Sequence, residues 1–130
     1  MRLILRTVLA IAVLSAAALA AGPLLQEAPA KVQRKVNPYA GDNAAMRAGE
    51  RLYRRECASC HGKAGEGGGT RPPLASKFVA DASPGALEWV IRNGDNRRGM
   101  PSFSHLPEPQ RWQIAAYLKK LSAPAQPRPE

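Results

Sequence analysis

The chain has 130 residues, enough for one domain of modest size with short segments at its ends. Its 19 Lys and Arg residues against 10 Asp and Glu give a formal net charge of +9, which suits nucleic acid, an anionic membrane surface or an acidic protein patch as partner. Aromatic residues make up only 5% of the chain, so side chains alone would build a small core. The two cysteines are too close in sequence to form a disulfide scaffold.

The start of the chain has the features of an export signal. Two arginines come first, the stretch 7–21 is almost wholly apolar, and positions 18–20 offer the small residues that a signal peptidase recognises. We therefore expect residues 1–20 to be a cleaved signal peptide. The alternative is an uncleaved membrane anchor, although Gly22 and Pro23 interrupt the apolar run before it reaches the roughly 20 residues of a spanning helix. Both interpretations place the domain in the periplasm.

The rest of the chain is expected to have three parts. Residues 21–42 mix Pro, Ala, Gln, Lys and Arg without a sustained period, which predicts a flexible linker. Residues 43–121 carry the periodic apolar pattern of a domain. Residues 122–130 contain three prolines and predict a disordered tail.

Three helices are predicted within the domain, and no segment has a convincing strand pattern. The first runs from about residue 43, behind a capping Asp or Asn, into the cysteine segment. The second covers about 83–94, and its Glu88 and Arg92 are expected to form an exposed i,i+4 pair. The third begins around 107–109 and ends near residue 121. The predicted fold class is therefore all-α, with long loops between the helices.

The sequence Cys57-Ala58-Ser59-Cys60-His61 is the most informative stretch. Residues i, i+3 and i+4 of a helical turn face the same way, so both sulfurs and the imidazole share one surface. Two thiols at this spacing can each add to a vinyl group of one porphyrin, and the adjacent imidazole can then bind its iron. The pattern predicts one haem c attached through Cys57 and Cys60, with His61 as an axial ligand.

Three other interpretations of the cysteines have weaker support. A thioredoxin-like thiol pair usually lies where a strand meets a helix, and no strand is predicted before Cys57. A zinc site built from Cys57, Cys60, His61 and His105 would place adjacent residues on one tetrahedral ion and lacks a second paired-ligand motif. A disulfide between two such close cysteines would contribute little loop-closure entropy.

The second axial ligand has to come from outside this motif. Of the three methionines, one lies in the leader and one on the first helix, which leaves Met100 in a Gly-Met-Pro turn. Pro101 biases the preceding backbone toward an extended conformation, and a thioether ligand stabilises ferrous iron. We predict His61 and Met100 as the axial pair, with His105 as the alternative to Met100. The competing interpretation is that Met100 only packs inside a loop.

The loop after the cysteines provides a hydrogen-bond acceptor for the proximal imidazole. A metal-binding histidine usually donates its other ring N–H to a fixed partner. Pro72 and Pro73 stiffen this loop, so the carbonyl of Pro72 is the predicted acceptor for His61. The basic side chains of residues 71, 97 and 98 either neutralise the haem carboxylates or lie on the surface.

These residues resemble the class I cytochrome c family, in its small bacterial single-haem form. The resemblance covers about residues 43–121, and it implies a cytochrome c-like fold in which the first helix crosses the last and Leu74 packs on the haem. It rests on the cysteine motif, on Pro72-Pro73-Leu74, on Gly99-Met100-Pro101-Ser102-Phe103, and on Gly49 and Tyr53 opposite Tyr117 and Leu118.

The resemblance implies electron transfer rather than catalysis. With both axial positions filled by protein, no open site would remain for a substrate. We expect a periplasmic single-electron carrier, not an enzyme, that links a dehydrogenase or quinol-oxidising complex to a terminal oxidase. The alternatives are a haem c subunit of an oxidoreductase complex, such as a sulfur- or alcohol-oxidising dehydrogenase, and a gas-sensing or peroxidatic haem.

The expected partners are redox proteins with acidic docking surfaces, because the chain itself is basic. Nucleic acid is not expected, since the basic residues are scattered and the leader directs export. A membrane would be contacted only through an uncleaved anchor.

Overall fold

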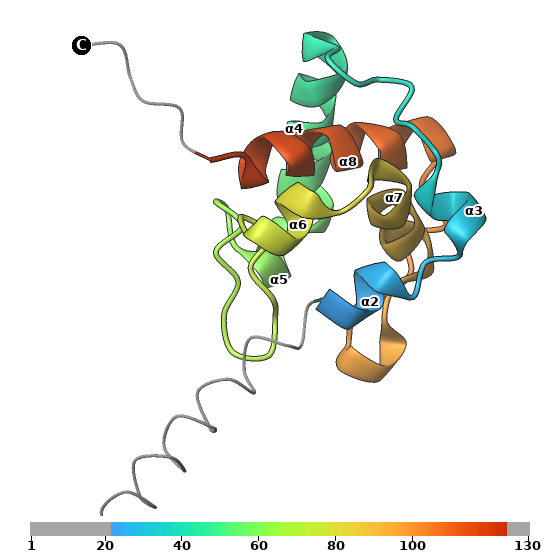
Figure 1. Cartoon of the computed structure of the whole chain (residues 1–130). Coiled ribbons are helices and arrows are strands. Elements are labelled where there is room, and N and C mark those ends of the chain that lie inside the picture. The colour runs from blue at the N-terminus through green and yellow to red at the C-terminus, as the bar shows by residue number, and fades with distance from the viewer. Residues whose placement is uncertain (1–21, 125–130) are drawn as a thin grey trace, which may run out of the picture.

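The computed structural model describes residues 22–124 (Figure 1), so the predicted leader and most of the predicted tail lie outside the described residues. Within this part the chain is helical and has no strand beyond two isolated bridges, which confirms the all-α prediction. None of its helices is both long enough and apolar enough to cross a bilayer. The elements are α2 (Gly22–Gln26), α3 (Ala30–Gln33), α4 (Asn43–Glu56), α5 (Ala58–His61), α6 (Lys77–Asp81), α7 (Pro84–Asn93), the 3-10 turn η2 (Asn96–Arg98) and α8 (Glu108–Ser122).

Two of the long helices begin at side-chain caps, and the first cap is one of the two residues that the sequence offered. The carboxylate of Asp42 accepts hydrogen bonds from the first free N–H groups of α4, at 2.8 and 3.0 Å. Ser83 caps α7 in the same way, accepting from the N–H of Ala86 at 3.1 Å, and Pro84 occupies the first turn. These side chains satisfy backbone donors that have no partner within the helix, which fixes where each helix starts.

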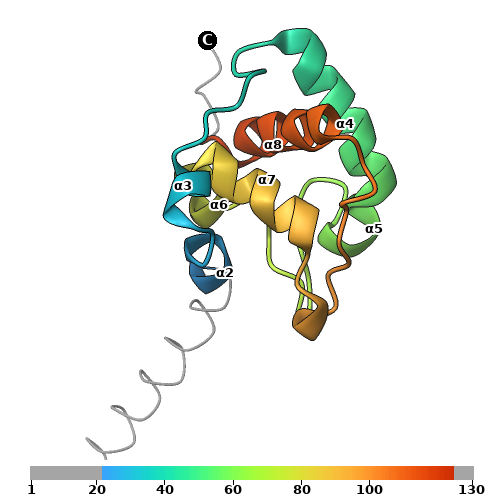
Figure 2. The ribbon, with the colours of Figure 1, turned by 90° about the vertical axis from the view of Figure 1, so that its right-hand side faces the viewer.

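Helices α4 and α8 cross (Figures 1 and 2), and Gly49 of α4 lies against α8. A Cβ atom on Gly49 would lie 1.9 Å from the carbonyl oxygen of Gln113, so only glycine allows the two backbones to come this close. One turn further along α4, the ring of Tyr53 is fully buried, with its centroid 5.3 Å from that of Tyr117. The first and last long helices therefore cross as the resemblance implied.

The predicted exposed pair between Glu88 and Arg92 is wrong. The Glu88 side chain is only 6% exposed, and its carboxylate accepts from Nε of the equally buried Arg111 of α8 at 2.7 Å. Arg111 also donates to the carbonyl of Leu106. A buried carboxylate needs a partner that satisfies its charge, whereas an exposed pair on one helix would contribute little. The ion pair therefore connects α7 to α8.

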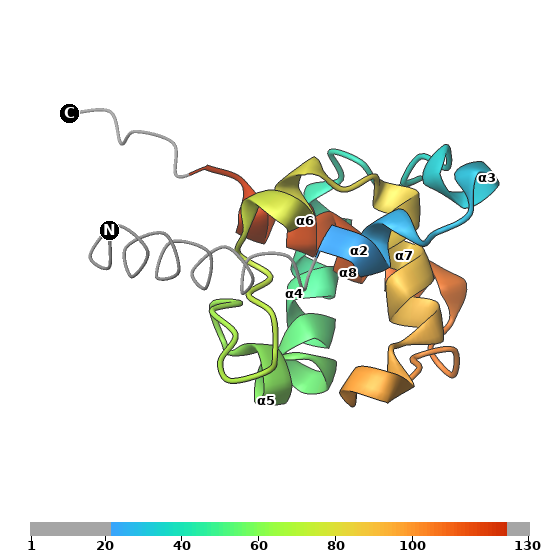
Figure 3. The same cartoon turned by 60° about the horizontal axis from the view of Figure 1, so that its bottom comes forward.

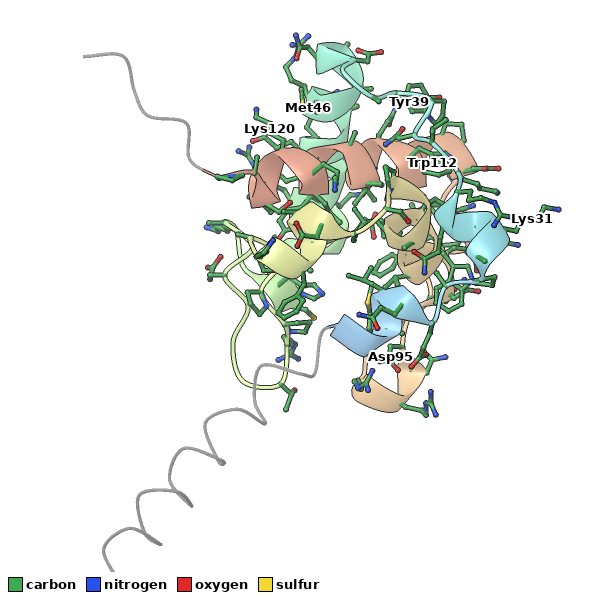
Figure 4. The ribbon with its side chains drawn as sticks, viewed as in Figure 1. Lys31, Tyr39, Met46, Asp95, Trp112 and Lys120 are labelled. Carbon is green, nitrogen blue, oxygen red and sulfur yellow. The ribbon has the colours of Figure 1, made fainter. Side chains whose placement is uncertain are left out.

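The segment before α4 also differs from the flexible linker expected over residues 21–42. It forms α2 and α3, which lie beside α7, and Figure 3 shows α2 in front of α7. A Cβ on Gly85 of α7 would lie 2.0 Å from the carbonyl oxygen of Val32, so α3 touches the α7 backbone. The buried Asn37 amide, in the chain that leads into α4, donates to the carbonyl of Trp112 at 2.8 Å, and Figure 4 labels Trp112 on α8.

Candidate functional site

The Cys57–His61 motif forms one helical turn directly after α4. Cys57 ends α4, residues 58–61 form α5, and Gly62 ends this turn with a φ of +86°. The hydroxyl of Tyr53 donates to the carbonyl of Gly62 at 2.7 Å, which ties the turn to the α4–α8 crossing. The two cysteines are free, Cys57 half-buried and Cys60 exposed, so the disulfide interpretation is not supported.

Two adjoining cavities of about 120 and 280 Å³ lie beside this turn and share four wall residues, Cys57, His61, Arg98 and Met100. We call the two together the central cavity. The walls of the smaller part are mainly apolar, whereas the larger part has a polar and partly basic rim. The smaller part is lined by Leu74, Val79, Leu87, Ile91, Ile114 and Leu118, among others, and the larger part by Ser59, Cys60, Thr70, Arg71, Pro101 and Phe103, among others.

The imidazole of His61 is buried at the wall of this cavity and is held by the loop that follows it. Its Nδ1 lies 3.0 Å from the carbonyl oxygen of Pro72, so the predicted hydrogen bond is present. A carbonyl oxygen only accepts, which places the hydrogen on Nδ1 and leaves the lone pair on Nε2. The loop is itself fixed, because Gly65 accepts from the N–H of Leu74 at 2.8 Å. His61 thus has one nitrogen available for a metal.

Met100 lines the central cavity from the loop between η2 and α8. Asp95 and Met100 exchange two backbone hydrogen bonds of 2.9 and 3.0 Å, which close this loop on itself. The carboxylate of Asp95 also accepts from Arg98 at 2.8 Å. Gly94 precedes the loop with a φ of +68°, and a Cβ there would lie 2.5 Å from the carbonyl oxygen of Pro101. A compact, internally bonded loop therefore presents Met100 to the same space as His61.

The other histidine is not part of this arrangement. His105 is exposed and does not line the central cavity, and its ring lies 5.9 Å from that of Phe103 between centroids. Among residues 22–124, no three His, Cys, Asp or Glu side chains are placed to hold a metal ion together. This arrangement speaks against the zinc interpretation.

The environment of Cys57 also speaks against a thioredoxin-like thiol. Burial raises the pKa of the Cys57 thiol to about 12, and the neighbouring Glu56 carboxylate acts in the same direction. Reactive redox cysteines instead have a lowered pKa, because nearby positive charge or a helix N-terminus stabilises the thiolate. Cys57 is therefore a neutral thiol at neutral pH.

Several wall residues of the central cavity were not foreseen from the sequence. Leu24 and Leu25 come from α2, within the expected linker, and Phe78 and Val79 come from α6, a helix too short to show a period. Two adjacent leucines after a proline were a visible signal of an apolar contact, but nothing in the sequence indicated what they cover. Pro72 and Leu74 also line the cavity, and the contact of Leu74 with a haem stays a prediction.

Residues 44–118 match the protein family described as cytochrome C oxidase, cbb3-type, subunit III. The chain belongs to this family of c-type cytochrome domains. The resemblance to class I cytochromes c is thereby confirmed, and the family implies haem c as the cofactor and electron transfer as the activity.

Two further proteins are similar to this cytochrome domain. The quinohemoprotein alcohol dehydrogenase ADH IIB of Pseudomonas putida is 33% identical over 84 residues, which are 64% of this chain and only 12% of that enzyme. The crystal structure of cytochrome cL from the marine methylotrophic bacterium Methylophaga aminisulfidivorans MPT superposes with a TM-score of 0.57 at 28% identity. It covers 65% of this chain and 58% of the other.

The chemistry of the cavity fits a haem. Two thiols, an imidazole with one available nitrogen and a thioether border one space, which is the donor set that a c-type haem requires. The apolar walls suit a flat macrocycle, and Arg71 in the larger part suits its carboxylates.

Proposed function

We propose that this cytochrome binds one haem c through thioether bonds to Cys57 and Cys60, with His61 and Met100 as the axial ligands of the iron. The observation that carries the proposal is the His61 ring, whose Nδ1 is held by Pro72 while Met100 and the cysteines border the same cavity. When bound, the haem supplies an iron that gains and loses one electron. If His61 and Met100 both hold the iron, no position would remain on it for a substrate, so the domain would transfer electrons and would not itself be an enzyme.

The chain's own groups hold the cofactor in a defined environment. The hydrogen bond to Pro72 fixes the tautomer and orientation of His61, and the closed loop after Gly94 fixes Met100. Leu74 and the apolar residues of α7 and α8 exclude water from one side of the cavity. Arg71 and Arg98 at the rim offer positive charge to the haem carboxylates or to a partner.

We propose further that the protein is a periplasmic carrier which accepts electrons from a dehydrogenase or quinol-oxidising complex and delivers them to a terminal oxidase. Two observations support a respiratory role. The matching family is described by its place in a cbb3-type oxidase, and one similar protein is an alcohol dehydrogenase that carries haem. The sequence features of a leader in residues 1–20 support export. The chain has a net charge of +9, which becomes +7 if Arg2 and Arg6 are removed with the leader, so the carrier would dock on acidic surfaces and its association rate would fall as salt increases.

A second candidate function is that of a haem c subunit within an oxidoreductase complex. The matching segment makes up only 12% of the Pseudomonas putida dehydrogenase, so a domain similar to this one occurs as a small part of a larger enzyme. The two candidate functions use the same haem chemistry. They differ in whether the protein is a free carrier or a subunit of a larger complex.

The haem proposal is tested by producing the full chain in a host that attaches haem c. The purified protein should gain the mass of one haem and show the bands of a low-spin, methionine-bound iron. Cys57→Ala and Cys60→Ala should each reduce covalent attachment, whereas Ser59→Ala, in the same turn between them, should leave it intact. A colourless protein at the mass of the bare polypeptide would contradict the proposal.

The carrier and subunit proposals are separated by native size. Extracts of the source cells are fractionated by size exclusion, with detection of both haem absorbance and this chain. A free carrier should elute near the monomer, since the whole chain has a mass of only 14.0 kDa. Complete co-elution with a much larger protein would favour the subunit.

A further inference from the structure

The segment expected to be a linker contributes to the wall of the central cavity. Leu24 and Leu25 of α2 line the smaller part of that cavity, together with Cys57, His61 and Met100. Both leucines are half-buried, and both precede residue 44, where the family match begins. This wall is therefore a feature of this chain outside the matched domain.

The position of α2 is fixed by contacts on its C-terminal side. The Gln33 amide donates to the carbonyl of Ala28 at 3.2 Å, and Ala28 is itself only 4% exposed. The carbonyl of Val32 lies directly against Gly85, and Asn37 donates to Trp112 at 2.8 Å. A segment that is held at several points has already lost its conformational freedom, so α2 can remain at the cavity without a large further entropic cost. Lys31, by contrast, points away from the body of the molecule and is exposed (Figure 4).

We infer that Leu24 and Leu25 seal the haem cavity from solvent and thereby raise the reduction potential of the bound haem. This inference rests on the proposed function. The oxidised iron carries one more positive charge than the reduced iron, and water or polar groups nearby stabilise that extra charge. Two apolar side chains at the cavity wall exclude such groups, so they favour the reduced state.

The half-exposed Phe78 strengthens this assignment. It lines the central cavity and also a neighbouring surface pocket, and Leu25 lines both as well. Leu25 and Phe78 therefore both lie between the central cavity and the outer surface. Removing the leucine side chains would open this boundary toward solvent.

The test uses the full chain with haem attached and two variants, Leu24→Gln and Leu25→Gln. Each places a polar amide at the cavity wall and should lower the reduction potential, while the absorption bands of the His-Met ligand pair stay unchanged. Val36→Gln is the matched control, because it makes a similar apolar-to-amide change on the same segment at a side chain that is 80% exposed. The control should leave the potential unchanged. Wild-type potentials in both leucine variants would overturn the inference.

A second measurement does not depend on the variants folding. Hydrogen exchange of the wild-type haem protein reports the backbone bonds of this segment, such as those from Val32 and Gln33 to the carbonyl of Pro29, at 2.8 and 3.0 Å. These amides should be protected, and exchange at the rate of an unstructured peptide would overturn the inference. Failure of haem attachment would contradict the proposed function. A normally ligated haem whose reduction potential does not change in the Leu24 and Leu25 variants would contradict only this inference.

Discussion

The ion pair between Glu88 and Arg111 gives the sharpest test of the packing between α7 and α8. The two side chains are 6% and 8% exposed, and the carboxylate oxygen lies 2.7 Å from the guanidinium Nε. Replacing Arg111 by Met removes one charge and leaves the carboxylate of Glu88 buried without its partner. Breaking a buried pair in this way costs about 3–5 kcal/mol. That is a large fraction of the roughly 5–15 kcal/mol by which small domains are stable.

The control is an ion pair with a similarly short distance between nitrogen and oxygen whose side chains are exposed to solvent. Lys77 and Asp81 of α6 lie 2.6 Å apart, with side chains 84% and 62% exposed, so Lys77→Met should cost less than about 1 kcal/mol. Urea unfolding of the haem-loaded variants, followed by far-UV circular dichroism, measures both free energies. The double variant Glu88→Leu/Arg111→Met should recover much of the loss, because no charge is then buried alone. Equal costs for Arg111→Met and Lys77→Met would refute the argument that burial decides the value of the pair.

Three further predictions concern the site and the helix crossing. Met100→Ala should lower the reduction potential and let the ferrous iron bind carbon monoxide, whereas His105→Ala should change neither, since His105 is outside the cavity. Tyr53→Phe removes a 2.7 Å hydrogen bond to Gly62 and should cost about 1 kcal/mol in urea unfolding. Burial raises the pKa of Tyr53 from 10.0 to about 12. The wild type should therefore have the higher free energy of unfolding below pH 10, and this difference should disappear as pH rises through 12. A pH-independent difference would contradict this. Gly49→Ala should cost about 1–3 kcal/mol, because its methyl group would lie 1.9 Å from a backbone oxygen of α8; an unchanged urea midpoint would disprove that close contact.

The sequence predicted features that depend on short stretches of chain. The caps at Asp42 and Ser83 are local side-chain-to-backbone bonds, so the starts of α4 and α7 could be predicted approximately, near residues 43 and 83. The acceptor at Pro72 could be predicted because two prolines restrict the conformation of the loop that follows His61. The roles of Cys57 and Met100 toward the haem remain predictions, although both line one cavity.

Contacts between distant segments could not be predicted in the same way. Glu88 and Arg111 are 23 residues apart, and helical periodicity offered the nearer Arg92 as a partner. The helices α2 and α3 were not predicted because the apolar residues of this segment do not recur at a helical period. It is held by single contacts, such as Val32 against Gly85, and by the two leucines of α2, rather than by a periodic apolar face. Such contacts depend on where α7 lies in space, and the sequence of the segment itself does not indicate that position.

The distribution of apolar side chains explains why this fold and its cofactor belong together. Among the described residues, Tyr53 and Ile114 are fully buried, and other large side chains of the core, such as Leu87 at 3% and Trp112 at 5%, are nearly so. Other apolar residues of α7 and α8, such as Ile91 and Leu118, face the central cavity. A haem against these walls would complete the core, and its binding energy would add to the stability of the fold. The leucines of α2 extend the same apolar wall from outside the matched domain. The residues that set the electron affinity of the iron would then also be residues that hold the helices in place.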